Sequence, residues 1–210
     1  MSTHAKRERL LLADLLEAAG PDAPTLCEGW LTRDLAAHVV LRERRPDAAG
    51  GMMVPALRNR LERVQSEYVS KPYEELVQLI RTGPPKMSPY GIKQLDELAN
   101  TVEFYVHAED VRRAQLAWTP RELDRVFADT LWSRVEKGGR LLGRKSPVGL
   151  VLRRPDGRTV VAHRGTPVVT VTGEPGELVL FVFGRQDATD VQLEGEKDAV
   201  ARLRGAKLGM

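Results

Sequence analysis

A glutamate and a histidine four residues apart, Glu103 and His107, are the side chains of this sequence best placed for chemistry. On an α-helix that spacing puts both on one face, about one turn apart. A carboxylate and an imidazole so placed can hold one cation, but they need a third ligand from elsewhere. His38, in the segment LTRDLAAHVV, is the candidate. Two histidines and one carboxylate leave coordination positions open, as in catalytic zinc sites and some non-haem iron sites.

The alternative interpretation of the same three residues is structural. Glu-x-x-x-His occurs by chance on many helices, so the spacing alone is a weak signal. A lone histidine on an apolar helix face is usually a packed, hydrogen-bonded core residue. Spacing therefore leaves both a metal site and a polar pair in a helical core open.

Two further charged side chains lie near these candidates. Asp110 is close in angle to Glu103 and His107, where it either orients a histidine ring or pairs with Arg113 three residues on. Arg42 lies one turn after His38, where it either meets an anionic ligand or pairs with a nearby acid.

The composition is that of an ordinary globular protein. The 210 residues suffice for one large or two small domains, and 42% of them are hydrophobic, enough to bury a core. The chain contains no run of about 18 apolar residues, so we expect no membrane span. Acidic residues interrupt the apolar N-terminal stretch, which indicates an amphipathic first helix rather than a signal peptide. One cysteine, Cys27, rules out an internal disulfide and favours a reducing, cytoplasmic location.

The charge pattern argues against a nucleic-acid partner. The net charge is only +3, and acidic residues are interleaved with arginines in segments such as RERL, RNRLER and EDVRR. Such segments are typical of solvated helix faces with i,i+4 pairs. Only 5% of the residues are aromatic, and no basic stripe carries them. We therefore expect small-molecule partners rather than nucleic acid.

The first part of the chain has the periodicity of helices. The spacing of apolar residues, with glycine and proline between the segments, predicts four helices. Three cover residues 4–19, 54–70 and 73–82, and the fourth begins with Thr32 as its cap and includes His38. Glycine and proline in RRPDAAGG and GPPKMSPYG predict breaks between them. The helix with Glu103 and His107 is expected from Ile92 to Leu116, and the next from Thr119 and Pro120 to about Gly138. Four principal helices suggest an antiparallel bundle, an architecture that builds metal sites from facing helices.

The spacing of apolar residues changes from that of helices to that of strands at about residue 146. Segments 150–153, 159–163 and 168–172 are short and rich in Val and Thr, which predicts a meander of strands. A helix over 175–183, a strand in DVQLEG and a last helix in EKDAVARLRGAKL follow. The expected fold class is therefore α + α/β: a helical domain over residues 1–145 and a small α+β domain with an antiparallel sheet over 146–210.

Three segments together resemble a known family. GWLTRDLAAHVV resembles the GW-T-xx-DL-x-AH signature of the mycothiol-dependent maleylpyruvate isomerase-like proteins, and EFYVHAED resembles their E-x-x-x-H followed by Asp. GELVLFVFGR, followed by VQLEGEKDAVARL, resembles the sterol-carrier-like C-terminal domain of that family. The resemblance covers nearly the whole chain, and the three motifs in order are more specific than any one alone.

The resemblance implies a DinB-like four-helix bundle with a metal site and a sterol-carrier-like α+β domain. The implied ligands are His38, Glu103 and His107, and the ion is zinc or another divalent metal such as nickel or iron. Its open position takes the thiolate of mycothiol, which attacks a small electrophile in a transferase or isomerase reaction. Arg185, in the FGR segment, and Asp110 are the candidate catalytic residues.

Other parts of the sequence leave the activity open. The segment with Cys27 and RERRPDA resembles an uncharacterised branch more than the isomerase itself, so fold does not fix the substrate. Arg42 is the candidate residue for binding the thiol cofactor. Cys27 is a buried residue, a fourth ligand or a redox-sensitive thiol. The alternative function is a non-catalytic metal- or ligand-binding regulator, and either protein is expected as a monomer or homodimer.

Overall fold

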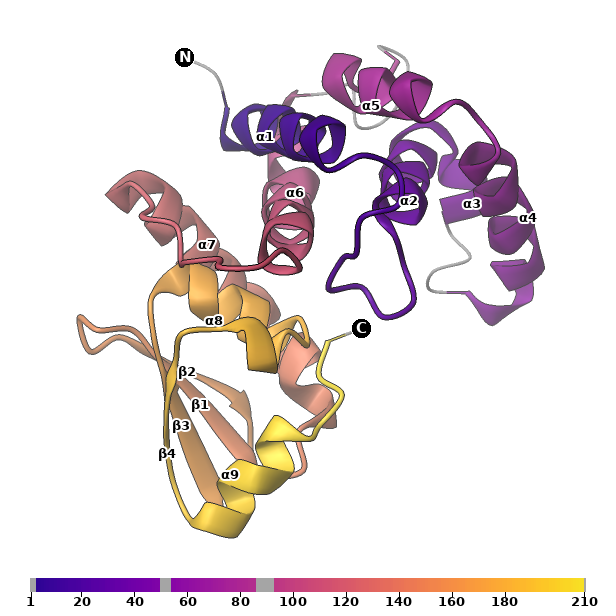
Figure 1. Cartoon of the computed structure of the whole chain (residues 1–210). Coiled ribbons are helices and arrows are strands. Elements are labelled where there is room, and N and C mark those ends of the chain that lie inside the picture. The colour runs from indigo at the N-terminus through magenta and orange to yellow at the C-terminus, as the bar shows by residue number, and fades with distance from the viewer. Residues whose placement is uncertain (1–2, 50–53, 86–92, 210) are drawn as a thin grey trace. The chain divides into compact units, whose positions relative to one another are not determined.

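The computed structural model describes residues 3–49, 54–85 and 93–209 and combines helices with one four-stranded sheet (Figure 1). Contacts divide the chain into two compact units, Met1–Trp118 and Thr119–Met210. The sequence places this boundary at residues 145 and 146. It lies earlier because helix α7 (Arg125–Leu142) packs on helix α8 (Pro175–Val182) and strand β2 (Thr159–His163). The helix expected to complete the bundle is thus part of the second unit.

The first unit is helical. Helix α1 packs along α6 and α5, and α2 packs on α4 and α5. The helices of this unit are α1 (His4–Ala19), α2 (Thr32–Arg44), α3 (Pro46–Ala49), α4 (Arg58–Val69), α5 (Tyr73–Thr82) and α6 (Lys93–Arg113). The expected bounds of α1 and α5 are therefore correct. Parts of two expected breaks, residues 50–51 and 86–91, lie outside the described residues, as does Ile92.

Buried apolar side chains from α1, α2, α5 and α6 form one core in the first unit. They include Leu12, Leu16, Leu35, Ile80 and Phe104, each fully buried. This core fixes the faces of α2 and α6 that carry the candidate ligands. The burial of apolar surface is what holds the polar groups beside it in place.

The start of α2 differs from the sequence expectation. Thr32 does not cap the helix: Leu31 precedes it, and the Leu31 N–H donates to Asp34 Oδ2 at 3.0 Å. The Thr32 hydroxyl instead donates to the Gly20 carbonyl just after α1. Both bonds fix where the chain leaves α1 and enters α2. That loop contributes two residues to the candidate site.

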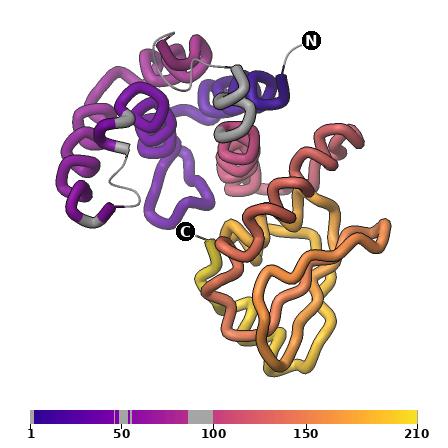
Figure 2. Tube along the Cα trace, turned by 180° about the vertical axis from the view of Figure 1, so that it is seen from behind, coloured from indigo at the N-terminus to yellow at the C-terminus, as the bar shows by residue number. Residues whose placement is uncertain are grey.

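The second unit begins with α7 and continues into the sheet. Asp124 caps α7 by accepting the Phe127 N–H at 2.9 Å, so the helix starts five residues after the Pro120 expected to begin it. The elements that follow it are β1 (Gly149–Arg153), β2, β3 (Val168–Thr172), α8, β4 (Gln192–Glu194) and α9 (Lys197–Arg204). In Figure 2, α7 runs alongside the strands of this unit, and it contacts β2.

The sheet has the order β2-β1-β3-β4 and is not a meander. Strand β3 pairs in parallel with β1, whereas β2 pairs antiparallel with β1 on its other side. Leu150 and Leu152 alternate with less buried residues and lie beside Val169 and Val171, so one face of the sheet is buried. The fold is therefore mixed α and β, as expected, with a sheet that is only partly antiparallel.

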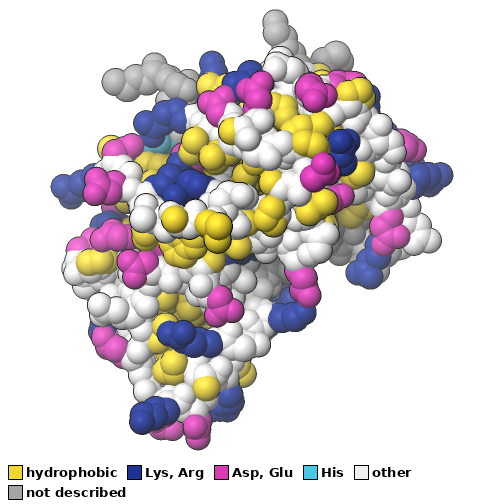
Figure 3. Space-filling view, viewed as in Figure 1, with side chains coloured by type: hydrophobic (Ala, Val, Ile, Leu, Met, Phe, Trp, Pro, Cys, Tyr) yellow, Lys and Arg dark blue, Asp and Glu magenta, His cyan; other side chains and the backbone are white. Residues whose placement is uncertain are grey.

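The surface carries interspersed charges. On the face shown in Figure 3, Lys and Arg side chains alternate with Asp and Glu over both units. Among the described residues, no helix combines the length and apolar character that crossing a bilayer requires.

Candidate metal centre

Helices α2 and α6 bring the three expected ligands together. His38 lies in the middle of α2, and Glu103 and His107 lie one turn apart on α6. The ligand atoms of these three side chains all lie within 4.8 Å of one another. The structure therefore groups the residues that the sequence singled out.

One carboxylate oxygen is shared by both imidazoles. Glu103 Oε1 lies 3.2 Å from His107 Nε2 and 3.7 Å from His38 Nε2. Zinc bonds of about 2.0–2.2 Å at tetrahedral angles place neighbouring ligand atoms roughly 3.3–3.5 Å apart. These two distances and the N,N,O donor set are therefore compatible with a shared divalent ion. The side chains of His38 and Glu103 remain 15% and 20% exposed, so the group is not sealed from solvent.

Asp110 holds the other side of the His107 ring. Its Oδ2 lies 2.9 Å from His107 Nδ1 and accepts the Cys27 thiol at 3.2 Å. Asp110 is fully buried, and it is Glu109 that forms the ion pair with Arg113. Asp110 thus takes the position of a residue that orients a histidine ring, which is one of its two sequence interpretations.

The loop between α1 and α2 supplies both neighbours of the histidines. The Leu26 N–H donates to the Asp110 carbonyl at 3.0 Å, which ties the loop to α6. Cys27 then reaches Asp110, and the Trp30 ring lies 5.0 Å from the His38 ring, centroid to centroid. Cys27 forms a second group of possible metal ligands with His107 and Asp110, on the Nδ1 side of the ring. It does not join the group that contains His38 and Glu103.

A buried polar network connects the site to α1. Arg42 Nε lies 3.5 Å from Glu103 Oε1, and the Arg42 guanidinium also donates to Asn100 Oδ1. Asn100 in turn donates to Glu43, which pairs with Arg9 of α1. The sequence patterns did not single out Asn100 or Glu43. Their signal is weak: Asn100 lies one turn before Glu103, and Glu43 follows Arg42 directly.

The three candidate ligands have perturbed pKa values. Burial lowers the pKa of His38, and the nearby His107 and Arg42 lower it further against the hydrogen bond with Glu103. Burial alone would raise the pKa of Glu103, but hydrogen bonds from His107 and His38 and the charge of Arg42 hold it well below its usual range. Perturbed groups of this kind concentrate at functional sites.

The His107 pKa moves in the opposite direction. Burial alone would lower it, but hydrogen bonds with Asp110, Cys27 and Glu103 raise it well above the usual range for histidine. These neighbours therefore favour the protonated ring, which has a proton on both nitrogens. A cation at Nε2 would replace one of those protons while the Nδ1 proton stays with Asp110.

The remaining candidate, Arg185, lies in the second unit. It follows α8, and its guanidinium donates to the carbonyl of Phe183, two residues earlier, at 2.6 Å. This contact orients the side chain within its own loop. Its role toward an anionic substrate remains a prediction, as does the role of Arg42 toward a cofactor.

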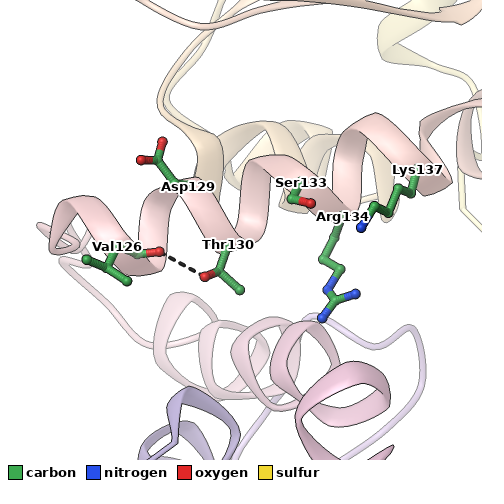
Figure 4. Close-up of a pocket in the computed structure, with 6 residues that line it drawn as sticks. All are labelled: Val126, Asp129, Thr130, Ser133, Arg134 and Lys137. Carbon is green, nitrogen blue, oxygen red and sulfur yellow. Dashed lines mark hydrogen bonds between the residues drawn. The ribbon is translucent and has the colours of Figure 1, made fainter. Parts of the chain in front are cut away.

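A hollow on α7 offers no comparable chemistry. It has a volume of about 420 Å³, and Figure 4 shows that the residues lining it lie along one side of this helix. The Thr130 hydroxyl donates back to the Val126 carbonyl at 2.8 Å, and the Asp129 carboxylate is paired with Arg154 and Arg158. We assign this hollow no function.

Comparison with known proteins supports a relation in fold. No protein-family model and no curated protein matches the sequence. Among solved structures, the chain is similar to mycothiol-dependent maleylpyruvate isomerase, with 20% identity, a TM-score of 0.50, and coverage of 93% of this chain and 97% of that one. A histidine-to-alanine mutant of the isomerase gives 19% identity and a TM-score of 0.51 over the same shares. At this identity the likeness shows a shared fold.

Proposed function

We propose that this protein is a metal-dependent enzyme that uses a low-molecular-weight thiol, with His38, Glu103 and His107 as the metal ligands. The observation that carries this proposal is the shared oxygen: two imidazole nitrogens lie 3.2 and 3.7 Å from Glu103 Oε1. The similarity in fold to a mycothiol-dependent isomerase also supports a thiol-dependent reaction. We further propose that the helical unit is a DinB-like bundle and the second unit is sterol-carrier-like.

The residues around the ligands have distinct roles in this proposal. Asp110 accepts the Nδ1 proton of His107 and so leaves the Nε2 lone pair for the ion. A divalent ion, zinc or alternatively nickel or iron, would lower the pKa of a thiol in its open position. Arg42 would bind an anionic group of the thiol cofactor, and Arg185 an anionic group of the substrate. Asp110 acts by positioning His107 rather than by contacting the substrate.

The proposed reaction is thiol transfer to a small electrophile, or its thiol-assisted isomerisation. Mycothiol is the type of thiol that the structural neighbours use, according to their names. We expect a cytoplasmic protein, monomeric or homodimeric, because such thiols and a reduced cysteine such as Cys27 belong to a reducing compartment.

A second candidate function is a non-catalytic metal- or ligand-binding regulator. Arg42 Nε lies 3.5 Å from the carboxylate oxygen that would bind the ion, so the charge of Glu103 has a counter-charge within the protein. This arrangement is also that of a polar network in a helical core. Metal content and thiol binding separate the two candidates.

The first experiment is elemental analysis of protein purified without added metal. We expect near-stoichiometric divalent metal in the wild type and its loss in His107→Ala. The control is His4→Ala, which removes a partly buried histidine from the start of α1, far from the three candidate ligands in the sequence. Absence of metal from the wild type would refute the metal site and the enzyme proposal together.

The second experiment tests thiol binding with cobalt in place of the native metal. Cys27→Ser protein is used, because the Cys27 thiol lies near the site and could itself bind cobalt. We expect a thiolate-to-cobalt absorption band to appear only when a low-molecular-weight thiol is added. Stoichiometric cobalt with no response to thiol would favour the non-catalytic regulator.

A further inference from the structure

A hollow in the second unit is lined by three arginines and a histidine. It lies where the end of α7 meets β2 and has a volume of about 290 Å³. Its lining residues are Arg140, Arg144, Val161, Ala162, His163 and Arg164. We call it the α7–β2 cleft. It shares no residue with the metal centre, whose side chains all belong to the first unit.

Gly139 in α7 and Gly143 directly after it build this cleft by letting the chain approach the strand closely. A Cβ on Gly139 would lie 3.6 Å from Val160 Cγ1, and one on Gly143 would lie 3.0 Å from both the Cβ and the carbonyl oxygen of Ala162. A side chain at Gly143 would therefore require Ala162, including its carbonyl oxygen, to shift by a few tenths of an ångström. Arg140 and Arg144 each follow one of these glycines directly, so the close approach brings both to the end of β2.

The arginines of the cleft lack an internal counter-charge. Within the part of the chain that the structure describes, Arg140, Arg144 and Arg164 make no ion pair and no side-chain hydrogen bond. The acid nearest to them in sequence is Glu136, four residues before Arg140, and it accepts a hydrogen bond from Trp132 Nε1 at 2.8 Å.

Three other arginines of the same unit are paired. Arg153 lies 2.7 Å from Glu194, Arg154 lies 2.6 Å from Asp129, and the Arg158 guanidinium lies 2.8 Å from Asp156. Among the described residues of this unit, Arg134, Arg202 and Arg204 also make no ion pair. The cleft differs from those positions because three such arginines line one hollow.

The helix dipole explains why one of these arginines is favourable at its position, but not why there are three. A single basic residue in the last turn, such as Arg140, is favourable at the negative end of the helix dipole. A second arginine one turn on repels the first, and Arg164 adds a third positive charge at the same hollow. An external anion would offset this repulsion. Guanidinium groups bind carboxylate and phosphate oxygens through paired hydrogen bonds.

We propose that the α7–β2 cleft binds a small oxyanion with two negative charges, a phosphate monoester or a dicarboxylate, through Arg140, Arg144 and Arg164. The half-exposed Val161 side chain offers the ligand an apolar contact beside these charges. This site is independent of the metal centre, so the failure of either proposal leaves the other standing.

The test is a titration of the full-length protein with inorganic phosphate and, separately, with succinate. NMR of the arginine Nε–H groups follows binding, and the tighter of the two anions identifies the ligand class. We expect saturable binding, weakened at least about tenfold in Arg140→Gln/Arg144→Gln, because charge-assisted hydrogen bonds are lost. The control is Arg202→Gln/Arg204→Gln, which removes the same charge from exposed positions of α9 and leaves binding unchanged.

A second variant separates geometry from charge. Gly143→Ala keeps every arginine but inserts the Cβ that meets Ala162 at 3.0 Å, so we expect weaker phosphate binding in protein that circular dichroism shows to be folded. The proposal is overturned if neither anion binds saturably, if the α9 control loses as much affinity as the cleft variant, or if folded Gly143→Ala binds as wild type. Binding of heparin alone, without either small anion, would also overturn it.

Discussion

His107 Nδ1 lies 2.9 Å from Asp110 Oδ2, on the side of the ring opposite the Nε2 atom that faces Glu103. Asp110 is fully buried one turn further along α6. A buried carboxylate in this position fixes both the tautomer and the orientation of an imidazole. The same carboxylate oxygen accepts the Cys27 thiol, so the loop before α2 takes part in holding the ring.

Asp110→Asn should weaken metal binding about 10–100-fold, the usual effect of losing a partner that orients a metal ligand. The amide can still accept the Nδ1 proton, but it no longer carries the negative charge that strengthens this bond. Affinity is measured by competition with a chromophoric chelator. Asp22→Asn, at an exposed position before α2, is the control and should bind as wild type. Equal affinities for Asp110→Asn and wild type would show that Asp110 does not position the ligand.

Cys27→Ala should lower the free energy of unfolding by about 0.5–1.5 kcal/mol, the typical net value of one hydrogen bond. The reason is that Asp110 Oδ2 loses the donor that lies 3.2 Å away. Cys27→Ser keeps a donor and should recover part of this loss. Urea denaturation of the metal-free protein measures the difference, and a serine variant no more stable than the alanine variant would contradict the role of the hydrogen bond.

The pair of Asp129 with Arg154 and Arg158 predicts a pH dependence of stability in the second unit. Hydrogen bonds from Arg154 and Arg158 hold the pKa of Asp129 below its ordinary value of 3.8. A carboxyl whose folded pKa is lowered contributes stability above its unfolded pKa and loses it as the pH falls through the folded pKa. The melting temperature of wild type should therefore exceed that of Asp129→Asn at neutral pH. The gap should narrow as the pH falls below 3.8 and close once Asp129 is protonated in the folded protein. A gap that persists in acid would exclude the ion pair as its source.

Gly149→Ala should destabilise the sheet strongly, by more than the roughly 0.5–3 kcal/mol typical of single substitutions. The added Cβ would lie 2.3 Å from the Gly165 carbonyl oxygen, a backbone atom that cannot move aside without breaking the β1–β3 pairing. Gly138→Ala is the control, because a Cβ there meets nothing within 4 Å and alanine favours a helix. Thermal unfolding of both variants checks the prediction, and a Gly149→Ala protein as stable as the control would refute it.

Short-range patterns predicted much of the fold. The strands at residues 159–163 and 168–172 and helix α5 have the expected bounds, because alternation, β-branched residues and breakers act within a few residues. The start of α7 was wrong because Asp124 outcompetes Thr119 as a cap. The parallel pairing of β3 with β1 and the placement of α7 in the second unit depend on contacts between distant residues, which no local pattern encodes.

In the candidate site, too, local sequence patterns predicted some features, and contacts between distant residues determine the others. The i,i+4 spacing of Glu103 and His107 was enough to place both on one face of α6, and the motif around His38 supplied the third residue. The part played by Cys27 was not predictable. It depends on where the loop after α1 crosses α6, and the hydrogen bond from Leu26 to Asp110 sets that crossing.

Every side chain in the candidate metal centre, from Cys27 to Asp110, belongs to the first unit, whereas the α7–β2 cleft belongs wholly to the second. The two sets share no residue, so a substitution in one set removes no side chain from the other. Selection can act on them separately, so a lineage can keep its metal ligands while its second unit acquires a new specificity, or the reverse.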